Sequence, residues 1–521
     1  MSQMLKSSGA MSVATLTSRV LGLVREQFYA SFMGTSAVAG AFQMAFTVPN
    51  LFRRLLGEGA LTAAFIPIFK EKEQTAGEVE MWRAANAVIS GLIVVSSVIV
   101  AAVMLGVTLA LALGHGSANT RLMLQLLRVM FPYMLLVCVA AAGMGMLNAR
   151  GHFFIPALSA AILNVAMIAS VIFLAPRMGG RIETQIFGLA IGVLFAGVAQ
   201  AGFQWPTLHR EGYRFAWVSP WRNETVRAVV RKMLPASIGV AAFQINVMLT
   251  QALAFGVHAP IVASFNYAVR LMEFPQGVFG ISLATYLLPT LSGLAAEKKY
   301  PEFRATLRQG LSHLMFVNLL ASVLLVALAE PIVRLLFERG KFDVGSTSNV
   351  SAALFCLAPG LVAFSTVNIL ARAFYALGDT QTPMRISIVC LAINLALAYL
   401  LLEPYQAAGL GLANTTTSLL NMALLFYALR RKLAKLELGE LLRSLPALFG
   451  AAMLAGMIGW VTWNRWEHYL GHANLWCKTA AVFLPMGTAT LMYLGVTNWL
   501  GFGFAAEVIA LLRAKLRRSG H

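Results

Sequence analysis

Long apolar blocks separated by short polar segments run through almost the whole chain. A helix needs about 20 apolar residues to cross the hydrocarbon core of a bilayer. After residue 85 the pattern predicts twelve such helices. Their approximate centres are Val100, Leu135, Ala166, Leu194, Val247, Phe279, Leu319, Pro359, Leu395, Leu419, Leu454 and Leu491. Two earlier blocks, Leu5 to Met33 and Ala37 to Phe69, can each form one more, although both contain arginines. The pattern therefore predicts an all-α polytopic membrane protein with about fourteen spans.

Composition supports this class and excludes others. Of the 521 residues, 59% are hydrophobic and 12% are charged, whereas soluble domains have about 25% charged residues. A soluble multidomain enzyme is therefore excluded. The formal net charge of +19 would suggest a polyanionic partner for a soluble protein. In a polytopic membrane protein it reflects Lys and Arg in the cytoplasmic loops, so we expect no nucleic-acid binding.

The charges of the loops test the number of spans. With fourteen spans, the loops after even-numbered spans carry most of the Lys and Arg residues, including the run Arg430 to Lys435. The C-terminal tail, on the same side, adds four more between Arg513 and Arg518. Loops after odd-numbered spans carry few. The positive-inside rule then places both termini in the cytoplasm, and thirteen spans would lose this agreement.

An internal repeat supports the same architecture. Residues 147–164 read LNARGHFFIPALSAAILN, and residues 374–394 contain YALGDTQTPMRISIVCLAIN. In both segments a glycine precedes a proline by five positions, and Gly188 resembles Gly409 in the spans that follow. A unit of six spans keeps its orientation when it is copied, which predicts two parallel lobes. The lobes would be residues 1–215 and 216–435, and residues 436–521 would add two spans and a basic tail. Chance similarity between apolar glycine-proline segments is the alternative.

The chemistry expected of a soluble enzyme is missing from the sequence. There is no GxxxxGK[ST], HExxH, GxSxG or CxxC motif. The residues Glu467, His468, His472 and Cys477 lie in a loop rich in tryptophan and tyrosine, which is typical of an aromatic belt at the membrane interface. We therefore predict no catalytic residue, no metal site and no cofactor, and a transporter in place of an enzyme.

The informative residues are arginines inside the predicted spans. A central arginine costs about 2.5–3.5 kcal/mol even on the lenient insertion scale, so it usually faces a cavity or a partner. Arg19, Arg25 and Arg53 lie on the first two spans, and Arg270 lies on the repeat-related eighth span. Local ion pairing, as between Arg270 and nearby Glu273, or snorkelling to the interface is the alternative. As a set, the four cations favour a cavity for a multivalent anion, because guanidinium groups match phosphate oxygens bidentately.

Prolines beside these arginines suggest where the helices bend. Proline removes a helical hydrogen bond and can unwind a span. Pro49, which precedes Asn50, and Pro275, which follows Glu273, adjoin the arginines of the second and eighth spans. We interpret these two prolines as hinge or gating positions.

Four segments closely resemble one known family. They are SRVLGLVRE (18–26), VPNLFRRLLGEGALTAAFIPIF (48–69), RLMEFPQGVFG (270–280) and FYALGDTQTP (374–383). The chain is similar over essentially its whole length to the MurJ (MviN) lipid II flippases of the multidrug/oligosaccharidyl-lipid/polysaccharide exporter superfamily. The resemblance implies fourteen spans in a six plus six plus two arrangement, and a role in cell-wall peptidoglycan biosynthesis.

The resemblance also implies roles for individual residues. Arg19, Arg25, Arg53 and Arg270 would engage the substrate diphosphate, with Glu58, Glu273 and Asn50 as polar partners in the cavity. The last two spans would border a groove for the lipid tail. Some relatives carry aspartates where this chain has Gly40 and Val269, so the cavity here should be more positive. Asp379 is a candidate for ion coupling.

Both lines of reasoning predict one mechanism. The lobes would admit the anionic headgroup of lipid II, leave its undecaprenyl tail in the bilayer, and rock to release the headgroup at the outer leaflet of the bacterial cytoplasmic (inner) membrane. The bilayer and the cell-wall synthesis machinery are the other expected partners. Two alternatives stay open: a flippase of the same superfamily for another polyprenyl-linked polysaccharide, and a polytopic lipid-linked-sugar transferase.

Overall fold

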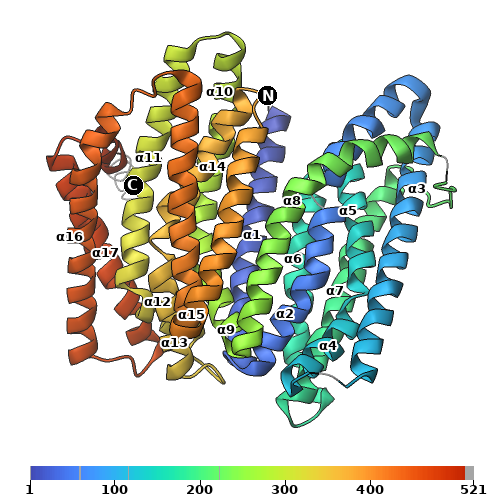
Figure 1. Cartoon of the computed structure of the whole chain (residues 1–521), viewed down its shortest axis with the longest axis horizontal. Coiled ribbons are helices and arrows are strands. Elements are labelled where there is room, and N and C mark those ends of the chain that lie inside the picture. The colour runs from blue at the N-terminus through green and yellow to red at the C-terminus, as the bar shows by residue number, and fades with distance from the viewer. Residues whose placement is uncertain (1, 58–59, 115, 222, 511–521) are drawn as a thin grey trace. The chain divides into compact units, whose positions relative to one another are not determined.

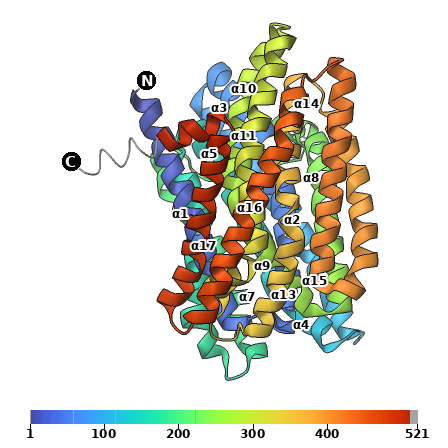
Figure 2. The ribbon, with the colours of Figure 1, turned by 90° about the vertical axis from the view of Figure 1, so that its left-hand side faces the viewer.

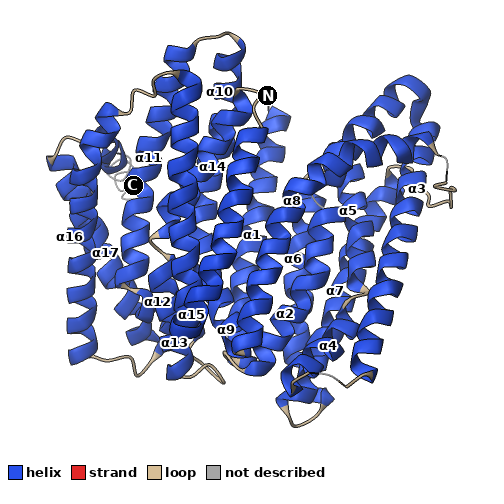
Figure 3. Cartoon of the chain, in the orientation of Figure 1, coloured by secondary structure: helices blue, strands red, loops and turns tan. Residues whose placement is uncertain are grey.

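The computed structural model describes residues 2–57, 60–114, 116–221 and 223–510. Within these ranges every regular element is a helix, as the single helix colour in Figure 3 shows. The predicted all-α class is therefore confirmed. Contacts along the chain separate two compact units, residues 1–263 and residues 264–521, and each is described by itself.

The first unit is a bundle of long helices interrupted by short irregular turns of helix (Figure 1). Its elements are α1 (Ser2–Met33), α2 (Ala37–Phe52), the π-helical segment η1 (Arg53–Gly57), α3 (Ala60–Ala112), α4 (Ala118–Met130), α5 (Tyr133–Ala149), α6 (Phe154–Ala169), the π-helical η2 (Ser170–Leu174), the 3₁₀-helical η3 (Ala175–Met178), α7 (Ile182–Arg210) and α8 (Glu224–Val257). Helix α1 packs on α6, α3 packs on α5 and α8, and α7 packs on α5 and α6. A buried cluster that includes Phe65, Phe69, Met146 and Tyr213 joins α3, α5 and the end of α7.

The second unit begins within α9 and contains the remaining helices. They are α9 (Ala259–Pro275), the π-helical η4 (Gln276–Ile281), α10 (Ser282–Ala296), α11 (Tyr300–Ala327), α12 (Ala329–Phe337), α13 (Val344–Leu357), α14 (Gly360–Ala376), α15 (Gln381–Leu433), α16 (Gly439–Tyr469) and α17 (Leu475–Trp499). Helix α15 packs on α13 and α14, and the α16–α17 pair packs on α11 (Figure 2). The approach of α16 to α11 is close, because a Cβ on Gly456 would lie 2.2 Å from a methyl carbon of Val323.

The helices lie where the sequence predicted the membrane spans, but the predicted number of fourteen spans is not confirmed. Every predicted centre after residue 85 lies within a helix, except Pro359, which lies at the junction of α13 and α14. Among the described residues, eight helices are long and apolar enough to cross a membrane, or up to ten if each of two bent pairs is one span. Helices α3 and α15 are each 53 residues long and are kinked at Gly77 and Gln406. The chain is thus a multi-pass membrane protein, while the count of fourteen and the lobe boundaries at residues 215 and 435 stay predictions.

The two segments of the predicted repeat end their helices in the same way. Gly151 after α5 and Gly378 after α14 both have positive φ, at 85° and 74°. In both turns the next residue, His152 or Asp379, donates its backbone N–H to a carbonyl five residues back, at 2.8 Å and 2.9 Å. This is the Schellman cap, which uses glycine because a Cβ is disfavoured at positive φ.

Candidate functional site

The arginines of α1 lie in two different environments. Arg19 is exposed, whereas Arg25 is largely buried. The Nη1 of Arg25 donates to Oδ1 of Asn164 on α6 at 3.0 Å, and its Nη2 donates to Oε1 of Glu26 at 2.5 Å. Its guanidinium also lies 5.4 Å from the centre of the Tyr29 ring. Arg25 is therefore an intramolecular tie between α1 and α6, and a diphosphate would have to replace one of these contacts.

Asn164 completes this tie from the α6 side. Its Nδ2 donates to the backbone carbonyl of Ser18 at 3.0 Å while its Oδ1 accepts from Arg25. The sequence interpretation missed Asn164, although an amide inside the apolar run AAILNVA was a usable signal. A polar side chain in an apolar span is expected to have a partner, because an unpaired polar group there is costly.

Helix α2 changes its winding where the predicted hinge and the predicted phosphate ligand meet. Pro49 is buried within α2, and Arg53 is the first residue of the π-helical η1. The Nε of Arg53 donates to Oδ1 of Asn50 at 2.8 Å, so these two predicted site residues are in contact. Glu58, the predicted polar partner, lies outside the described residues.

Polar contacts also join α2 and η1 to α8. Thr47 Oγ1 donates to Gln251 Oε1 at 2.6 Å, and Arg54 Nη1 lies 3.4 Å from Gln244 Oε1. Helix α8 therefore packs on α2 and η1 partly through hydroxyl, guanidinium and amide groups. Neither glutamine was singled out from the sequence, since hydropathy alone does not report which spans share a polar face.

In the second unit the predicted pair on α9 is formed. Arg270 Nη1 donates to Glu273 Oε2 at 2.7 Å, and both side chains are about half exposed (47% and 48%). Exposed pairs of this kind contribute about 0–1 kcal/mol to stability, so the pair can open at little cost. Pro275 ends α9, and the π-helical η4 follows it directly.

The π-helical segments η1 and η4 occupy matching places in the predicted repeat. Ala41-Phe42-Gln43 on α2 matches Ser264-Phe265-Asn266 on α9, and η1 and η4 begin at the same distance after these tripeptides. Single π-helical turns inside α-helices are frequent at functional sites. The second and eighth spans, which carry Arg53 and Arg270, thus each contain an irregular turn at the matching position.

Gly40 lies where α2 and the start of α9 meet. A Cβ at Gly40 would lie 1.9 Å from the carbonyl oxygen of Ala259, so α2 touches the start of α9 backbone to backbone. An aspartate at this position requires the two helices to move apart. Val269 is half-buried beside Arg270.

Asp379 is held by its surroundings at the start of α15. Its Oδ1 accepts from the backbone N–H of Thr382 at 3.0 Å, and its Oδ2 accepts from Lys432 Nζ at 2.6 Å. The hydrogen bond from Lys432, followed by the one from the Thr382 N–H, lowers the pKa of Asp379 to about 2. The carboxylate therefore caps a helix and pairs with the end of α15, and its ion-coupling role stays a prediction.

The described geometry brings together some of the predicted residues and leaves the rest as separate groups. Asn50 contacts Arg53, and Arg270 contacts Glu273. Arg19, Arg25 and Arg53 belong to the first unit and Arg270 to the second. The convergence of all four on one diphosphate is therefore a proposal.

Comparison with known proteins gives consistent matches. A family model described as "Lipid II flippase MurJ" matches residues 29–479. The "Probable lipid II flippase MurJ" of Haemophilus influenzae is 33% identical over 485 residues, which cover 89% of this chain and 92% of that protein.

Two solved structures show the same fold. "Lipid II flippase MurJ, inward closed conformation" matches with a TM-score of 0.75 at 22% identity, covering 96% of this chain and 99% of that one. An inward-facing multidrug resistance MATE family transporter of the MOP superfamily matches with a TM-score of 0.66 at 16% identity, covering 81% of this chain and 96% of its own. The predicted exporter-like fold is thus confirmed, and the match of the family model over most of the chain, with relatives above 30% identity, shows that this protein belongs to the MurJ family.

Proposed function

We propose that this chain moves lipid II, the undecaprenyl-diphosphate-linked peptidoglycan precursor, from the inner to the outer leaflet of the bacterial cytoplasmic membrane. The observation that carries the proposal is membership of a lipid II flippase family over residues 29–479. The positive side chains at membrane depth add chemistry that suits the substrate, because guanidinium groups bind phosphate oxygens with paired hydrogen bonds. The flippase needs no covalent step, and both chain termini lie in the cytoplasm.

Arg19 and Arg270 make the first contact with the diphosphate in this proposal. Both side chains are exposed, and the ion pair between Arg270 and Glu273 is of the exposed kind that contributes about 0–1 kcal/mol. Arg53, whose Nε donates to Asn50 on the same span, follows. Arg25 contributes mainly by its charge, because its guanidinium is held by Asn164 and Glu26.

Alternating access then uses the irregular turns of α2 and α9–α10. Pro49 precedes η1 by one helical turn, and Pro275 precedes η4 directly. Proline leaves a carbonyl without its helical donor, and a π-helical turn already carries mismatched hydrogen bonds, so bending there costs less than elsewhere. The two units rock at these positions while the polyprenyl tail stays in the bilayer.

The test replaces Arg19, Arg25, Arg53 and Arg270 singly by lysine and by alanine. Each protein is purified, its thermal unfolding is measured, and transfer of lipid II between leaflets is followed in vesicles. Loss of a charge-assisted hydrogen bond is worth about 1.5–3 kcal/mol, so Arg270→Ala should slow transfer about 10- to 100-fold without loss of stability. Arg270→Lys keeps the charge and should fall between wild type and alanine.

Two controls separate binding from folding and from general charge. Arg25→Ala should lower the unfolding temperature as well as transfer, because it removes the α1–α6 tie. Arg385→Ala, an exposed arginine at the start of α15, should change neither. If all four alanine variants transfer lipid II at the wild-type rate and with normal stability, the diphosphate proposal is wrong. Transfer of another polyprenyl-linked saccharide in place of lipid II would instead favour a different substrate for the same fold.

A further inference from the structure

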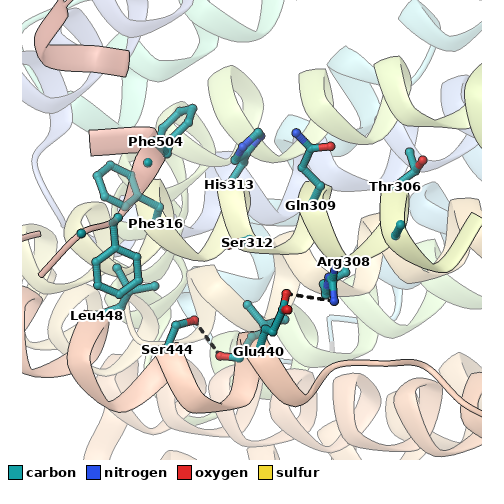
Figure 4. A pocket seen from close by; sticks show the side chains of 15 residues that line it. Thr306, Arg308, Gln309, Ser312, His313, Phe316, Glu440, Ser444, Leu448 and Phe504 are labelled. Atoms are coloured by element: carbon teal, nitrogen blue, oxygen red, sulfur yellow. Dashed lines mark hydrogen bonds and ion pairs between the residues drawn. The ribbon is translucent and has the colours of Figure 1, made fainter. Parts of the chain in front are cut away.

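A cavity of about 650 Å³ lies in the second unit, between α11, α16 and the segment that follows α17. Figure 4 shows its lining: charged and polar side chains gather at one end, around Arg308 and Glu440, and aromatic and aliphatic side chains gather at the other, around Phe316, Phe504 and Leu448. Both α11 and α16 are long and apolar enough to span a membrane. The cavity lies at the ends of these helices where their charged residues begin, which is the depth of the membrane–water interface.

The two helices present the same sequence of side-chain types along the cavity. On α11 these are Arg308, Ser312 and Phe316, and on α16 they are Glu440, Ser444 and Leu448. Residues four apart lie on one face of a helix, about 6 Å further along its axis. The charged residues of the two helices lie at the same height, because Arg308 Nη1 lies 2.9 Å from Glu440 Oε2. The cavity therefore has a charged layer, a hydroxyl layer and an apolar layer.

The apolar layer is closely packed. Phe504 lies with its ring centre 5.0 Å from that of Phe316, and the same distance separates Phe316 from Tyr493. The Tyr493 hydroxyl donates to the backbone carbonyl of Phe316 at 2.7 Å. His313, between the layers, lies 4.6 Å from Phe504 ring to ring. The charged layer, in contrast, is open, since the Glu440 side chain is 76% exposed and that of Arg308 is 32% exposed.

We propose that this cavity binds one glycerophospholipid with a phosphoethanolamine headgroup. Arg308 takes the phosphate and Glu440 takes the ammonium, so that the zwitterion replaces the ion pair between the two side chains. Ser312 and Ser444 meet the glycerol and ester oxygens, and the first part of the acyl chains lies on Phe316, Leu448 and Phe504. The lipid then holds the α16–α17 pair against α11 at this end.

Charge complementarity selects this headgroup among membrane lipids. A purely anionic headgroup, as in phosphatidylglycerol, satisfies Arg308 and leaves the Glu440 carboxylate facing negative charge. A choline headgroup carries its charge on methyl groups and offers Glu440 no N–H donor. A primary ammonium makes charge-assisted hydrogen bonds to a carboxylate, which are about twice as strong as neutral ones.

The test uses native mass spectrometry of the full-length protein, released from detergent after titration with single lipids of equal acyl chains. Phosphatidylethanolamine should fill one site at least about 10-fold more tightly than phosphatidylglycerol or phosphatidylcholine. Arg308→Gln and Glu440→Gln should each weaken that site about 10-fold and reduce the headgroup preference. Ser312→Leu, which fills the hydroxyl layer in a spanning helix, should abolish it.

The matched controls are Lys299→Gln and Glu297→Gln, which break an exposed ion pair of 2.7 Å just before α11 and outside the cavity. Both should bind phosphatidylethanolamine like wild type. Soluble glycerophosphoethanolamine should fail to compete, since it lacks the acyl chains. Equal binding of the three lipids, stronger binding of phosphatidylglycerol, or unchanged binding by Arg308→Gln with normal unfolding would each overturn the proposal, as would full competition by the soluble headgroup.

Discussion

Two turns of the chain have the same backbone conformation, but the charges of the side chains that pair at them are reversed. Both follow a helix that ends in a left-handed glycine, Gly151 after α5 and Gly378 after α14. In the first turn the residue after glycine is His152, which lies 2.8 Å from Glu211 beyond the end of α7. In the second it is Asp379, which lies 2.6 Å from Lys432 at the end of α15. By their positions after Gly188 and Gly409, Glu211 and Lys432 are themselves counterparts in the repeat.

The first turn carries a larger network than the second. Arg150, just before the glycine, is bound by Glu73, by Glu78 at 3.0 Å and by Glu211 at 2.9 Å. The hydrogen bonds from His152 and then Arg150 lower the pKa of Glu211. Three carboxylates thus share one guanidinium that is only 20% exposed, and two of them, Glu73 and Glu211, are also paired with Lys70 and His152. The second turn has one ion pair and the helix cap that Asp379 provides to Thr382.

The comparison indicates which property of the turn is required. The glycine cap is the same in both units, whereas the acid and the base have exchanged places. What the two turns have in common is a connection to the end of a later helix, α7 or α15, and either order of charges supplies it. Such a connection keeps the helices of one unit together, as a rigid-body movement of that unit requires.

The largest expected effect is at the centre of the larger network. Arg150→Met should lower the free energy of unfolding by about 2–3 kcal/mol, because it removes the cation that three carboxylates share, while Lys70 still pairs with Glu73 and His152 with Glu211. Lys432→Met should lower it by about 1 kcal/mol or less, since one partly exposed pair is lost. Thermal unfolding of both variants in the same detergent measures the difference.

Arg210→Met, a change at an exposed arginine near the same corner, is the control and should leave the unfolding temperature within error. Equal losses for Arg150→Met and Lys432→Met would contradict the difference drawn between the two turns.

The sequence predicted the helices and the likeness of these two turns well, because both depend on local sequence. Apolar length located the spans, and the shared glycine-proline spacing located the two turns, whose caps have the same geometry. Nothing in the sequence, however, distinguishes Arg150 from the other positive charges of the loops. Its three partners come from α3 and from the end of α7, and nothing in local sequence reports which distant acids will meet it.

The candidate site shows the same limit. The pair Arg270–Glu273 was predictable because residues three apart share a helical face. The contact of Arg25 with Asn164 joins residues 139 apart and depends on the packing of α1 on α6. The π-helical turns were predicted only as bends at prolines, since proline marks a weakened helix without specifying how its hydrogen bonds rearrange.

A second and smaller effect should appear at low pH. The pKa of Asp379 is lowered from 3.8 to about 2 in the folded protein. Its contribution to stability is therefore fully present above about pH 4 and is lost as the pH falls through 2. Wild type should lose about 1–2 kcal/mol of unfolding free energy over this range that Asp379→Asn does not lose. The readout is the difference between their unfolding curves at several pH values.

Asparagine suits this comparison because its side-chain oxygen still caps α15, while its charge is gone. The difference between the two curves cancels the protonation of other carboxylates. Parallel curves for wild type and Asp379→Asn between pH 4 and pH 2 would mean that the pair with Lys432 contributes nothing to stability.

The smallest effect concerns what the two turns share. Gly151→Ala and Gly378→Ala each place a side chain at positive φ, which costs about 1 kcal/mol. A Cβ at either position meets nothing within 4 Å, so the whole cost comes from the backbone and should be the same in both turns. Asparagine, which tolerates this conformation better, should cost less at both.

The matched controls are Gly106→Ala in α3 and Gly293→Ala in α10, where a Cβ also meets nothing within 4 Å and φ is negative. Alanine is favoured over glycine inside a helix by about 1 kcal/mol, so these variants should be neutral or more stable. Equal losses at Gly151 and Gly378 would identify the cap as the common element of the repeat. A loss at Gly378 alone would mean that the Arg150 network holds the first turn without help from its glycine, and that the two turns are stabilised in different ways in spite of their common shape.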